Sequence, residues 1–282
     1  MFPAFPYFFI SFLYSTRWSN HKLRIPGIHP TLSVLYSTPL DAIENFDCDY
    51  IAMGHYASVE HTPRVKMLRG LDSNKDQTYF LEQLSKEQLA KSLFPLGNLL
   101  KKDVREIAKK EGLHNSDKKD STGICFIGER PFTEFLNKYI ENSPGPIKDE
   151  HGKTLGEHIG LMFYTLGQRQ GLGIGGSKTS NGEPWFVVEK NIKENVLIVA
   201  QGHTHPLLFK DGLVAKKAHW IDGALPEKHW VYGAKTRYRQ PDAPCEIDMI
   251  KDDSVEIFFG QKQWAITPGQ SVVVYESNVC LG

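Results

Sequence analysis

Short runs with the composition of β-strands recur through the last third of the chain. They lie at residues 213–215, 230–232, 245–247, 255–258 and 272–275, and residues common in turns separate them. Many short strands divided by turns are typical of sandwiches and barrels. The pattern therefore predicts a small β-barrel over residues 206–282.

A second β-rich segment precedes this barrel. Residues 185–189 and 196–201 are apolar runs joined by a polar stretch at 191–195, which predicts a β-hairpin. Ser-Pro-Gly-Pro at 143–146 is typical of a linker. We therefore expect a small central domain over residues 141–205.

Residues 41–140 have the pattern of part of a nucleotide-binding α/β domain. Tyr50-Ile51-Ala52-Met53 predicts a buried strand that ends at Gly54. Ligands of such sheets bind beyond the carboxyl ends of the strands, and Gly54 would let the backbone approach a nucleotide there. The expected fold class is therefore α/β for this segment, followed by the two β domains.

Three helices are predicted within this first domain. Ser85-Lys86-Glu87-Gln88 has the form of a capping box, so one helix starts there and stops before Pro95. A second helix runs from about Leu100 to Gly112, with one apolar face towards the core and one basic face. A third is indicated over residues 132–139.

Composition leaves room for two or three domains, since 282 residues exceed the usual size of one hydrophobic core. Net charge is zero, but residues 101–119 hold seven bases against four acids and residues 210–240 hold seven against three. Both stretches could follow a phosphate backbone, and a solvated helix or strand face explains each equally well. The apolar run at 2–14 is shorter than the roughly 20 residues of a membrane helix, so we expect no membrane anchor.

Four cysteines, Cys48, Cys125, Cys245 and Cys280, lie far apart and form no C-x-x-C pair. We therefore expect no structural metal and a reducing cytoplasmic location. His203 and His205 have no acidic or thiol cluster near them in the sequence, so we expect a turn before Pro206 and not a metal pair.

Cys125 is the candidate nucleophile. It lies in a polar, glycine-containing stretch, and Lys118, Lys119 and Arg130 would lower its pKa if they lie close in space. The alternative is a small buried apolar residue, which is the more common role of a free cysteine. Gly171–Gly176 formally matches G-x-G-x-x-G, but no strand precedes it and no helix follows, so a dinucleotide site is rejected.

Two further motifs combine groups that suit nucleic acid. Lys75-Asp76-Gln77 joins a cation for phosphate to an amide that could read a base edge, although an ordinary exposed loop has the same composition. Lys235-Thr236-Arg237-Tyr238-Arg239 alternates basic and aromatic residues on a predicted strand, which would pair phosphate contact with stacking.

Six landmarks then give the chain a family resemblance. From about Asp41 to the end it resembles the tRNA-specific 2-thiouridylases of the MnmA type, in the family's order. The landmarks are residues 54–56, 71–77, 120–130, 164–169, 235–239 and 267–270.

The resemblance implies that residues 41–140 are the remnant of a nucleotide-binding α/β sheet domain. It also implies that sulfur replaces the 2-oxygen of the wobble uridine of tRNA. The expected cofactor is ATP with magnesium, and the expected partners are tRNA and a persulfide sulfur-relay protein; we expect a monomer. Cys125 would carry the sulfur as a persulfide, and Gly54 would contact ATP. Contact with tRNA is implied for His55, Lys75, Asp76, Gln77, Arg237, Tyr238 and Gln270.

The amino terminus departs from the family. Relatives carry a Ser-Gly-Gly-x-Asp-Ser phosphate loop and a Pro-Asp-x-x-Cys-Asn motif with the second catalytic cysteine, and neither is present. Cys48 has a different setting, so that role is not transferred to it. We expect residues 1–40 to come from a frameshift or a mis-assigned start, and the barrel to be incompletely closed at Gly282.

Two alternatives stay open. One is a non-catalytic tRNA-binding fragment of a thiouridylase, which the missing phosphate loop favours. The other is an unrelated cysteine acyl-transfer enzyme, for which no Cys-His-Asn pattern stands out.

Overall fold

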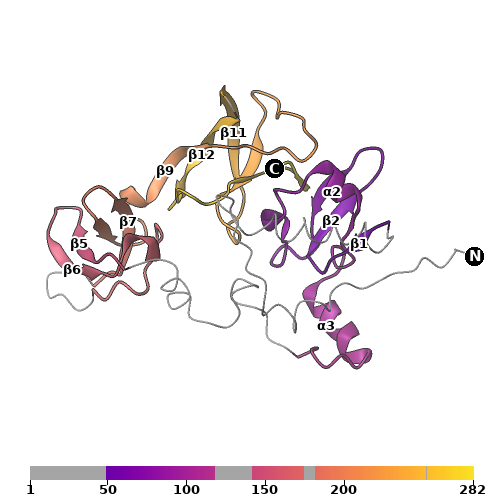
Figure 1. Cartoon of the computed structure of the whole chain (residues 1–282), viewed down its shortest axis with the longest axis horizontal. Helices are drawn as coiled ribbons and strands as arrows, with labels where there is room; N and C mark the ends of the chain where they lie inside the picture. The colour runs from indigo at the N-terminus through magenta and orange to yellow at the C-terminus, as the bar shows by residue number, and fades with distance from the viewer. Residues whose placement is uncertain (1–48, 118–141, 175–181, 252) are drawn as a thin grey trace, which may run out of the picture. The chain divides into compact units, whose positions relative to one another are not determined.

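The computed structural model describes residues 49–117, 142–174, 182–251 and 253–282, which form two compact units (Figure 1). Unit 1 holds the described residues of 49–117, 214–257 and 271–282, and unit 2 those of 142–213 and 258–270. These units do not follow the domain boundaries expected from the sequence, at 41–140, 141–205 and 206–282. Those boundaries stay a prediction. Cys48, Cys125 and the helix predicted at 132–139 lie outside the described residues.

A short parallel sheet in unit 1 gives the first segment its α/β character. Strand β1 (Ile51–Ala52) pairs in parallel with β4 (Ser92–Leu93). The Met53 amide continues the ladder by donating to the Leu93 carbonyl at 2.9 Å. The predicted strand at 50–53 is confirmed in its core, with Ile51 buried and Tyr50 half exposed.

Two helices of unit 1 begin and end as predicted. Helix α2 (Lys86–Ala90) has the capping box: the Ser85 hydroxyl accepts from the Gln88 amide, and the Gln88 side chain accepts from the Ser85 amide at 2.8 Å. Helix α3 (Lys101–Lys110) ends at Gly112, whose φ of +67° suits glycine.

The core face predicted for α3 is wrong. No residue of α3 is buried, and Ile107 is 49% exposed. Helical spacing decides which side chains share a face, but burial also needs a partner surface, and that depends on the rest of the fold.

Eight further strands form a single sheet. This sheet confirms that the carboxyl-terminal segment is rich in β-strands, as predicted. Its hydrogen-bonded order is β2-β3-β14-β13-β10-β11-β12-β9. The strands are β2 (Ala57–Glu60), β3 (Lys66–Arg69), β9 (Phe209–Ala215), β10 (Tyr232–Lys235), β11 (Ala243–Lys251), β12 (Ser254–Trp264), β13 (Val273–Glu276) and β14 (Val279–Cys280).

The pairing of β3 with β14 joins the first segment to the end of the chain. Met67 lies opposite Cys280 and Leu68 opposite Val279 in this antiparallel pair. The Arg69 amide also donates to the Asn278 carbonyl at 2.9 Å. Two segments that the sequence assigns to different domains therefore share one sheet and one compact unit.

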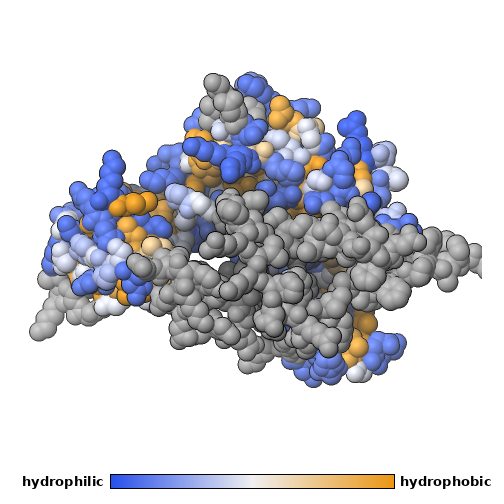
Figure 2. Space-filling view, in the orientation of Figure 1, coloured by the Kyte–Doolittle hydropathy of each residue, from blue (hydrophilic) through white to orange (hydrophobic). Residues whose placement is uncertain are grey.

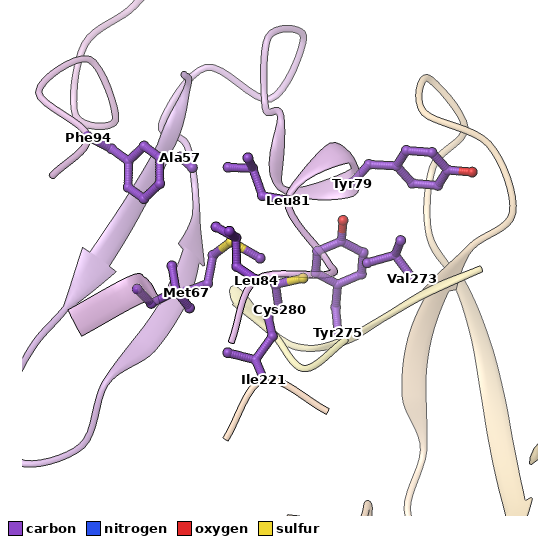
Figure 3. Packing of buried hydrophobic residues seen from close by; sticks show 11 residues of the cluster. Ala57, Met67, Tyr79, Leu81, Leu84, Phe94, Ile221, Val273, Tyr275 and Cys280 are labelled. Carbon is purple, nitrogen blue, oxygen red and sulfur yellow. The ribbon is translucent and has the colours of Figure 1, made fainter. Parts of the chain in front are cut away.

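The hydrophobic core of unit 1 draws on both of these segments (Figure 3). Figure 3 shows Met67 and Leu84 from the first segment beside Cys280 and Tyr275 from the last strands. All four side chains are at most 2% exposed. The cluster consists of Ala57, Met67, Tyr79, Leu81, Leu84, Leu89, Phe94, Ile221, Val273, Tyr275 and Cys280.

Unit 2 contains a four-stranded sheet of order β6-β5-β8-β7. Its strands are β5 (Gly145–Asp149), β6 (Thr154–His158), β7 (Trp185–Asn191) and β8 (Val196–Gln201). The antiparallel pair of β7 and β8 confirms the predicted hairpin. Val187 packs in one core cluster while Phe186 and Val188 pack in another, so both faces of the sheet are covered.

The linker predicted at 143–146 is wrong in its second half, because Gly145 and Pro146 begin β5. The Asn195 side-chain amide donates to the carbonyls of Ser143 and Pro144, which holds this segment against the hairpin turn. Pro and Gly are common in turns, which is why the sequence predicted a linker here. Hydrogen bonds to residues distant in the chain hold the segment in place instead.

Hydrophilic residues cover most of the described surface that is visible in Figure 2, with smaller hydrophobic areas between them. Across the described ranges, no helix has the length and apolar character that a membrane crossing requires.

Candidate functional site

Asp76 is a buried carboxylate and not part of an exposed loop, so that sequence-based interpretation is wrong. Its side chain accepts from the Gly70 amide at 3.1 Å and from the Thr78 hydroxyl at 2.9 Å. Only 5% of the residue is exposed. The carboxylate is therefore hydrogen-bonded within the protein, because the Gly70 amide and the Thr78 hydroxyl take the place of water.

Lys235 is the cation opposite this carboxylate. Its Nζ lies 3.7 Å from Oδ2 of Asp76 and 5.4 Å from the centre of the Tyr275 ring. The Tyr275 hydroxyl in turn lies 3.2 Å from the Thr78 hydroxyl. Two predicted motifs, at 75–77 and 235–239, are therefore joined through a buried ion pair.

Gln77 joins a third motif to the same structure. Its side-chain oxygen accepts from the Tyr56 amide at 2.9 Å, and its own amide donates to the Tyr56 carbonyl at 2.9 Å. Gln77 thus satisfies both backbone groups of Tyr56, as a neighbouring strand would do. Residues 54–56 and 75–77 consequently lie side by side.

Gly54 and His55 follow the carboxyl end of β1. Gly54 is exposed, and a Cβ added there would meet only Leu96 Cδ1, at 4.0 Å. Packing in the described structure therefore does not demand glycine, and neither does a positive φ. The space at Gly54 leaves room for the close approach of a ligand.

His55 is held in an apolar setting. Its ring packs edge-on against Phe94 at 6.4 Å, and burial lowers the pKa of the imidazole. Within the described structure its Nδ1 is buried with no hydrogen-bond partner. The imidazole is therefore neutral near pH 7, and its nitrogens can serve as hydrogen-bonding groups but not as a charge for phosphate.

Aromatic rings gather beside the motifs at residues 75–77 and 235–239. Phe80 lies 4.3 Å from Tyr238 between ring centres, with 40° between the ring planes. Tyr79 contacts both, at 5.6 Å from Phe80 and 6.3 Å from Tyr238. We call Tyr79, Phe80, Arg237 and Tyr238 the aromatic–basic cluster.

Arg237 supplies the charge of this cluster. Burial lowers the pKa of its guanidinium, and the nearby Tyr79 acts in the opposite direction. Burial also raises the pKa of Tyr79 to about 12, with a further contribution from Glu82, while Arg237 opposes the shift. At neutral pH the tyrosine is therefore neutral and the arginine charged, which combines stacking surface with a cation.

The strand predicted for 235–239 is wrong beyond Lys235. Strand β10 ends at Lys235, and Arg237 and Tyr238 lie in the turn that follows. The Thr236 hydroxyl donates to the Gln240 side chain at 2.8 Å and closes this turn. Alternation of basic and aromatic residues did not distinguish a strand from a turn held by side-chain bonds.

Gln270 belongs to unit 2, unlike the other described candidates. It is exposed in the turn Thr267-Pro268-Gly269-Gln270, where its amide donates to the Thr267 carbonyl at 3.2 Å. Seven predicted residues lie in unit 1: Gly54, His55, Lys75, Asp76, Gln77, Arg237 and Tyr238. Cys125, the predicted nucleophile, lies outside the described residues.

The described part of the chain holds no group of three His, Cys, Asp or Glu residues suited to a metal ion. His203 stacks on Trp264 at 4.7 Å, and His205 accepts from the Leu207 amide as the cap of the short helix η4 (Pro206–Leu208). The turn predicted before Pro206 is confirmed.

Sequence reasoning missed Tyr79, Phe80 and the structural role of Lys235. Tyr79 and Phe80 follow Lys75-Asp76-Gln77 within the short helix η2 (Thr78–Phe80), so aromatic residues next to a polar motif were the available signal.

Comparisons with known proteins cover most of the chain. Three family models match: the tRNA methyl transferase HUP domain at residues 26–129, the tRNA methyl transferase PRC-barrel domain at 133–201 and the aminomethyltransferase beta-barrel domain at 210–282. The first match begins at residue 26, ahead of the start at Asp41 that the landmarks suggest.

Curated relatives agree in name. A protein of Methylobacillus flagellatus is 60% identical over 258 residues, covering 91% of this chain and 72% of the relative. Relatives from Nitrosomonas europaea and Nitrosomonas eutropha are 56% and 53% identical, each over 91% of this chain and 71% and 72% of their own lengths. All three are called tRNA-specific 2-thiouridylase MnmA. On this identity and coverage, together with the three matching domain models, the chain belongs to the tRNA-specific 2-thiouridylase family of the MnmA type.

Proposed function

We propose that this chain binds tRNA and takes part in the thiolation of its wobble uridine at C2. The observation that carries the proposal is the 60% identity to a tRNA-specific 2-thiouridylase over 91% of the chain. The aromatic–basic cluster supports it, because a cation beside aromatic rings suits phosphate contact combined with base stacking.

The chemistry we propose begins with an activated uracil. Bound ATP would supply the adenylyl group that makes the 2-oxygen a leaving group. Gly54 would lie against the nucleotide, since its position at the end of β1 leaves space where a side chain would otherwise stand. Magnesium is proposed only as the usual companion of ATP.

Cys125 is proposed to take the outer sulfur of a persulfide relay protein, whose own thiol is released, and to present it to the activated carbon, from which AMP leaves. A second thiol, supplied by the sulfur donor, would then form a disulfide with Cys125 and so release the thiolated uridine. A thiolate is the form that accepts and carries sulfur, and Lys118, Lys119 and Arg130, near it in sequence, would favour that form if they lie close in space. His55, Lys75, Gln77, Arg237, Tyr238 and Gln270 are proposed to contact the tRNA. For Asp76 we propose an indirect role, because its carboxylate is occupied inside unit 1.

A sulfur-transfer assay tests the proposal. The purified chain is incubated with hypomodified tRNA, ATP and a persulfide donor, and thiolated tRNA is detected as a retarded band on a mercury-containing gel. We expect a retarded band for the native chain and none for Cys125→Ser. Cys245→Ser is the matched control, because Cys245 is buried and burial raises the pKa of its thiol to about 12.

Other outcomes separate the alternatives. Salt-dependent tRNA binding without thiolation would favour a non-catalytic tRNA-binding fragment, and a Cys125→Ser protein that still accepts sulfur would remove the role of Cys125. Absence of both tRNA binding and thiolation would contradict the proposal as a whole.

A further inference from the structure

Phe80 exposes more apolar surface than its neighbours. It is 42% exposed, whereas the adjacent Tyr79 is only 7% exposed and belongs to the core of unit 1. Both residues lie in the short helix η2, so the same backbone turn directs one ring inward and leaves the other open to solvent. Phe80 therefore presents an aromatic ring to solvent directly beside a buried one.

The ring of Phe80 is held in place from two sides. Tyr238 lies against it at 4.3 Å, and Tyr79 meets it edge-on at 5.6 Å with 87° between the planes. Tyr79 is itself anchored, because its hydroxyl donates to the Ser271 carbonyl at 2.8 Å. Tyr238 packs against the core cluster of unit 1. The exposed ring is therefore preorganised, which reduces the entropy lost when a ligand stacks on it.

The charges around the pair favour one class of partner. Arg237 directly precedes Tyr238 and lies close enough to Tyr79 for each to shift the pKa of the other. Lys75 lies in the motif that leads into the helix of Phe80. A nucleic acid suits this combination, since it offers a flat base for the rings and phosphates for the cations, whereas an apolar protein surface would match only the rings.

We propose that Phe80, together with Tyr238, forms a stacking platform for one unpaired base of the bound RNA. The proposal rests on the tRNA binding proposed above and adds a contact residue to it. The base must be unstacked from its neighbours, because an aromatic side chain can stack only on a base whose face is free. A base in a single-stranded loop or one turned out of its stack meets this condition.

Substitutions at Phe80 separate stacking from packing. Phe80→Leu keeps an apolar side chain of similar size but removes the ring, and Phe80→Trp keeps a ring. Binding of an unmodified tRNA transcript to the full chain is measured at several salt concentrations. Because stacking on an aromatic ring contributes to binding, we expect the affinity of Phe80→Leu for the transcript to be lower by about fivefold or more. The affinity of Phe80→Trp should stay near that of the native chain.

Two comparisons make the result specific. Phe258→Leu is the matched control, since Phe258 is 50% exposed on β12 and outside the cluster, and its tRNA affinity should not change. For Phe80→Leu the slope of log affinity against log salt should stay native, because no phosphate contact is lost, whereas Arg237→Ala should make it shallower. Equal melting temperatures would show that the variants are folded.

The platform is overturned if Phe80→Leu binds the transcript as tightly as the native chain, or if Phe80→Trp binds as weakly as Phe80→Leu. Either result would leave tRNA binding by the native chain intact. A native chain with no salt-dependent affinity for the transcript would overturn both the platform and the proposed function.

Discussion

Asp76 and Lys235 form a buried ion pair that joins two distant motifs of the chain, with 3.7 Å between Oδ2 and Nζ. Their side chains are only 3% and 10% exposed. Asp76 precedes the helix of Phe80, and Lys235 ends the strand that leads to Arg237 and Tyr238. The ion pair therefore helps hold residues 79–80 next to residues 237–238, the two parts of the aromatic–basic cluster.

Removing one charge of this pair should destabilise unit 1. Asp76→Asn would leave the Lys235 ammonium buried without its counter-charge, and we expect a loss of roughly 3–5 kcal/mol in the free energy of unfolding. Urea denaturation measures it, and adding Lys235→Met to Asp76→Asn should recover part of the loss. An exposed pair gives the control: Lys228 and Asp248 are closer, at 3.0 Å, but 65% and 60% exposed, so Asp248→Asn should cost at most about 1 kcal/mol. Equal effects of the two substitutions would contradict this account.

Glu82 should make the stability of unit 1 fall as pH rises. Burial raises the pKa of its carboxyl above the ordinary value of 4.5, while a hydrogen bond from Ser271 opposes the shift. The folded state therefore holds the proton longer than the unfolded state, and this contribution is present below pH 4.5 and lost as pH rises through the folded pKa. Glu82→Gln mimics the protonated form, so its melting temperature relative to the native chain should increase from pH 5 to pH 8.

Glu87 provides a control of opposite sign. Its carboxylate accepts from the Ser85 hydroxyl at 2.8 Å, and this bond lowers the pKa of Glu87. The stabilisation is present above the unfolded pKa and lost at lower pH, so Glu87→Gln should be less stable than the native chain at pH 8 and converge with it in acid. Parallel pH profiles for the two variants would refute the assignment.

Gly54→Ala should separate nucleotide binding from folding. An added Cβ has 4.0 Å to its nearest neighbour, so the melting temperature should stay native or rise slightly, because alanine restricts the unfolded chain. ATP affinity, measured by titration calorimetry, should fall if Gly54 lies against the nucleotide. Gly97→Ala is the contrast, since a Cβ there would meet the Ala57 carbonyl oxygen at 2.0 Å and lower the stability. Unchanged ATP affinity in Gly54→Ala would remove Gly54 from the nucleotide site.

Cys245 and Cys280 should resist alkylation in the native protein. Both are buried, and burial raises the pKa of each thiol, to about 12 for Cys245. Iodoacetamide at pH 8 should label neither of them until the chain is unfolded in urea, as peptide mass spectrometry would report. Rapid labelling of either thiol in the folded chain would mean that its site opens readily.

Local chemistry made several features predictable. The capping box at Ser85 and the helix stop at Gly112 depend on residues a few positions apart, and both occur as expected. The hairpin of β7 and β8 likewise follows from two apolar runs with a short polar connection. The motifs at 75–77 and 235–239 were recognised because each is contiguous in the chain, whereas Tyr79 and Phe80 were not recognised as part of the site.

Sequence by itself determined the family, the motifs and those elements that depend on short stretches of residues, such as the capped helix α2 and the hairpin of β7 and β8. Tertiary structure decided that β3 pairs with β14, that Asp76 is buried against Lys235 and that Phe80 lies against Tyr238. Each of these contacts joins residues far apart in the chain, and nothing in the local pattern specifies such a partner. A carboxylate in a polar motif can be solvated or buried with equal local propensity; which one occurs depends on whether distant residues supply the hydrogen bonds and the counter-charge that replace water.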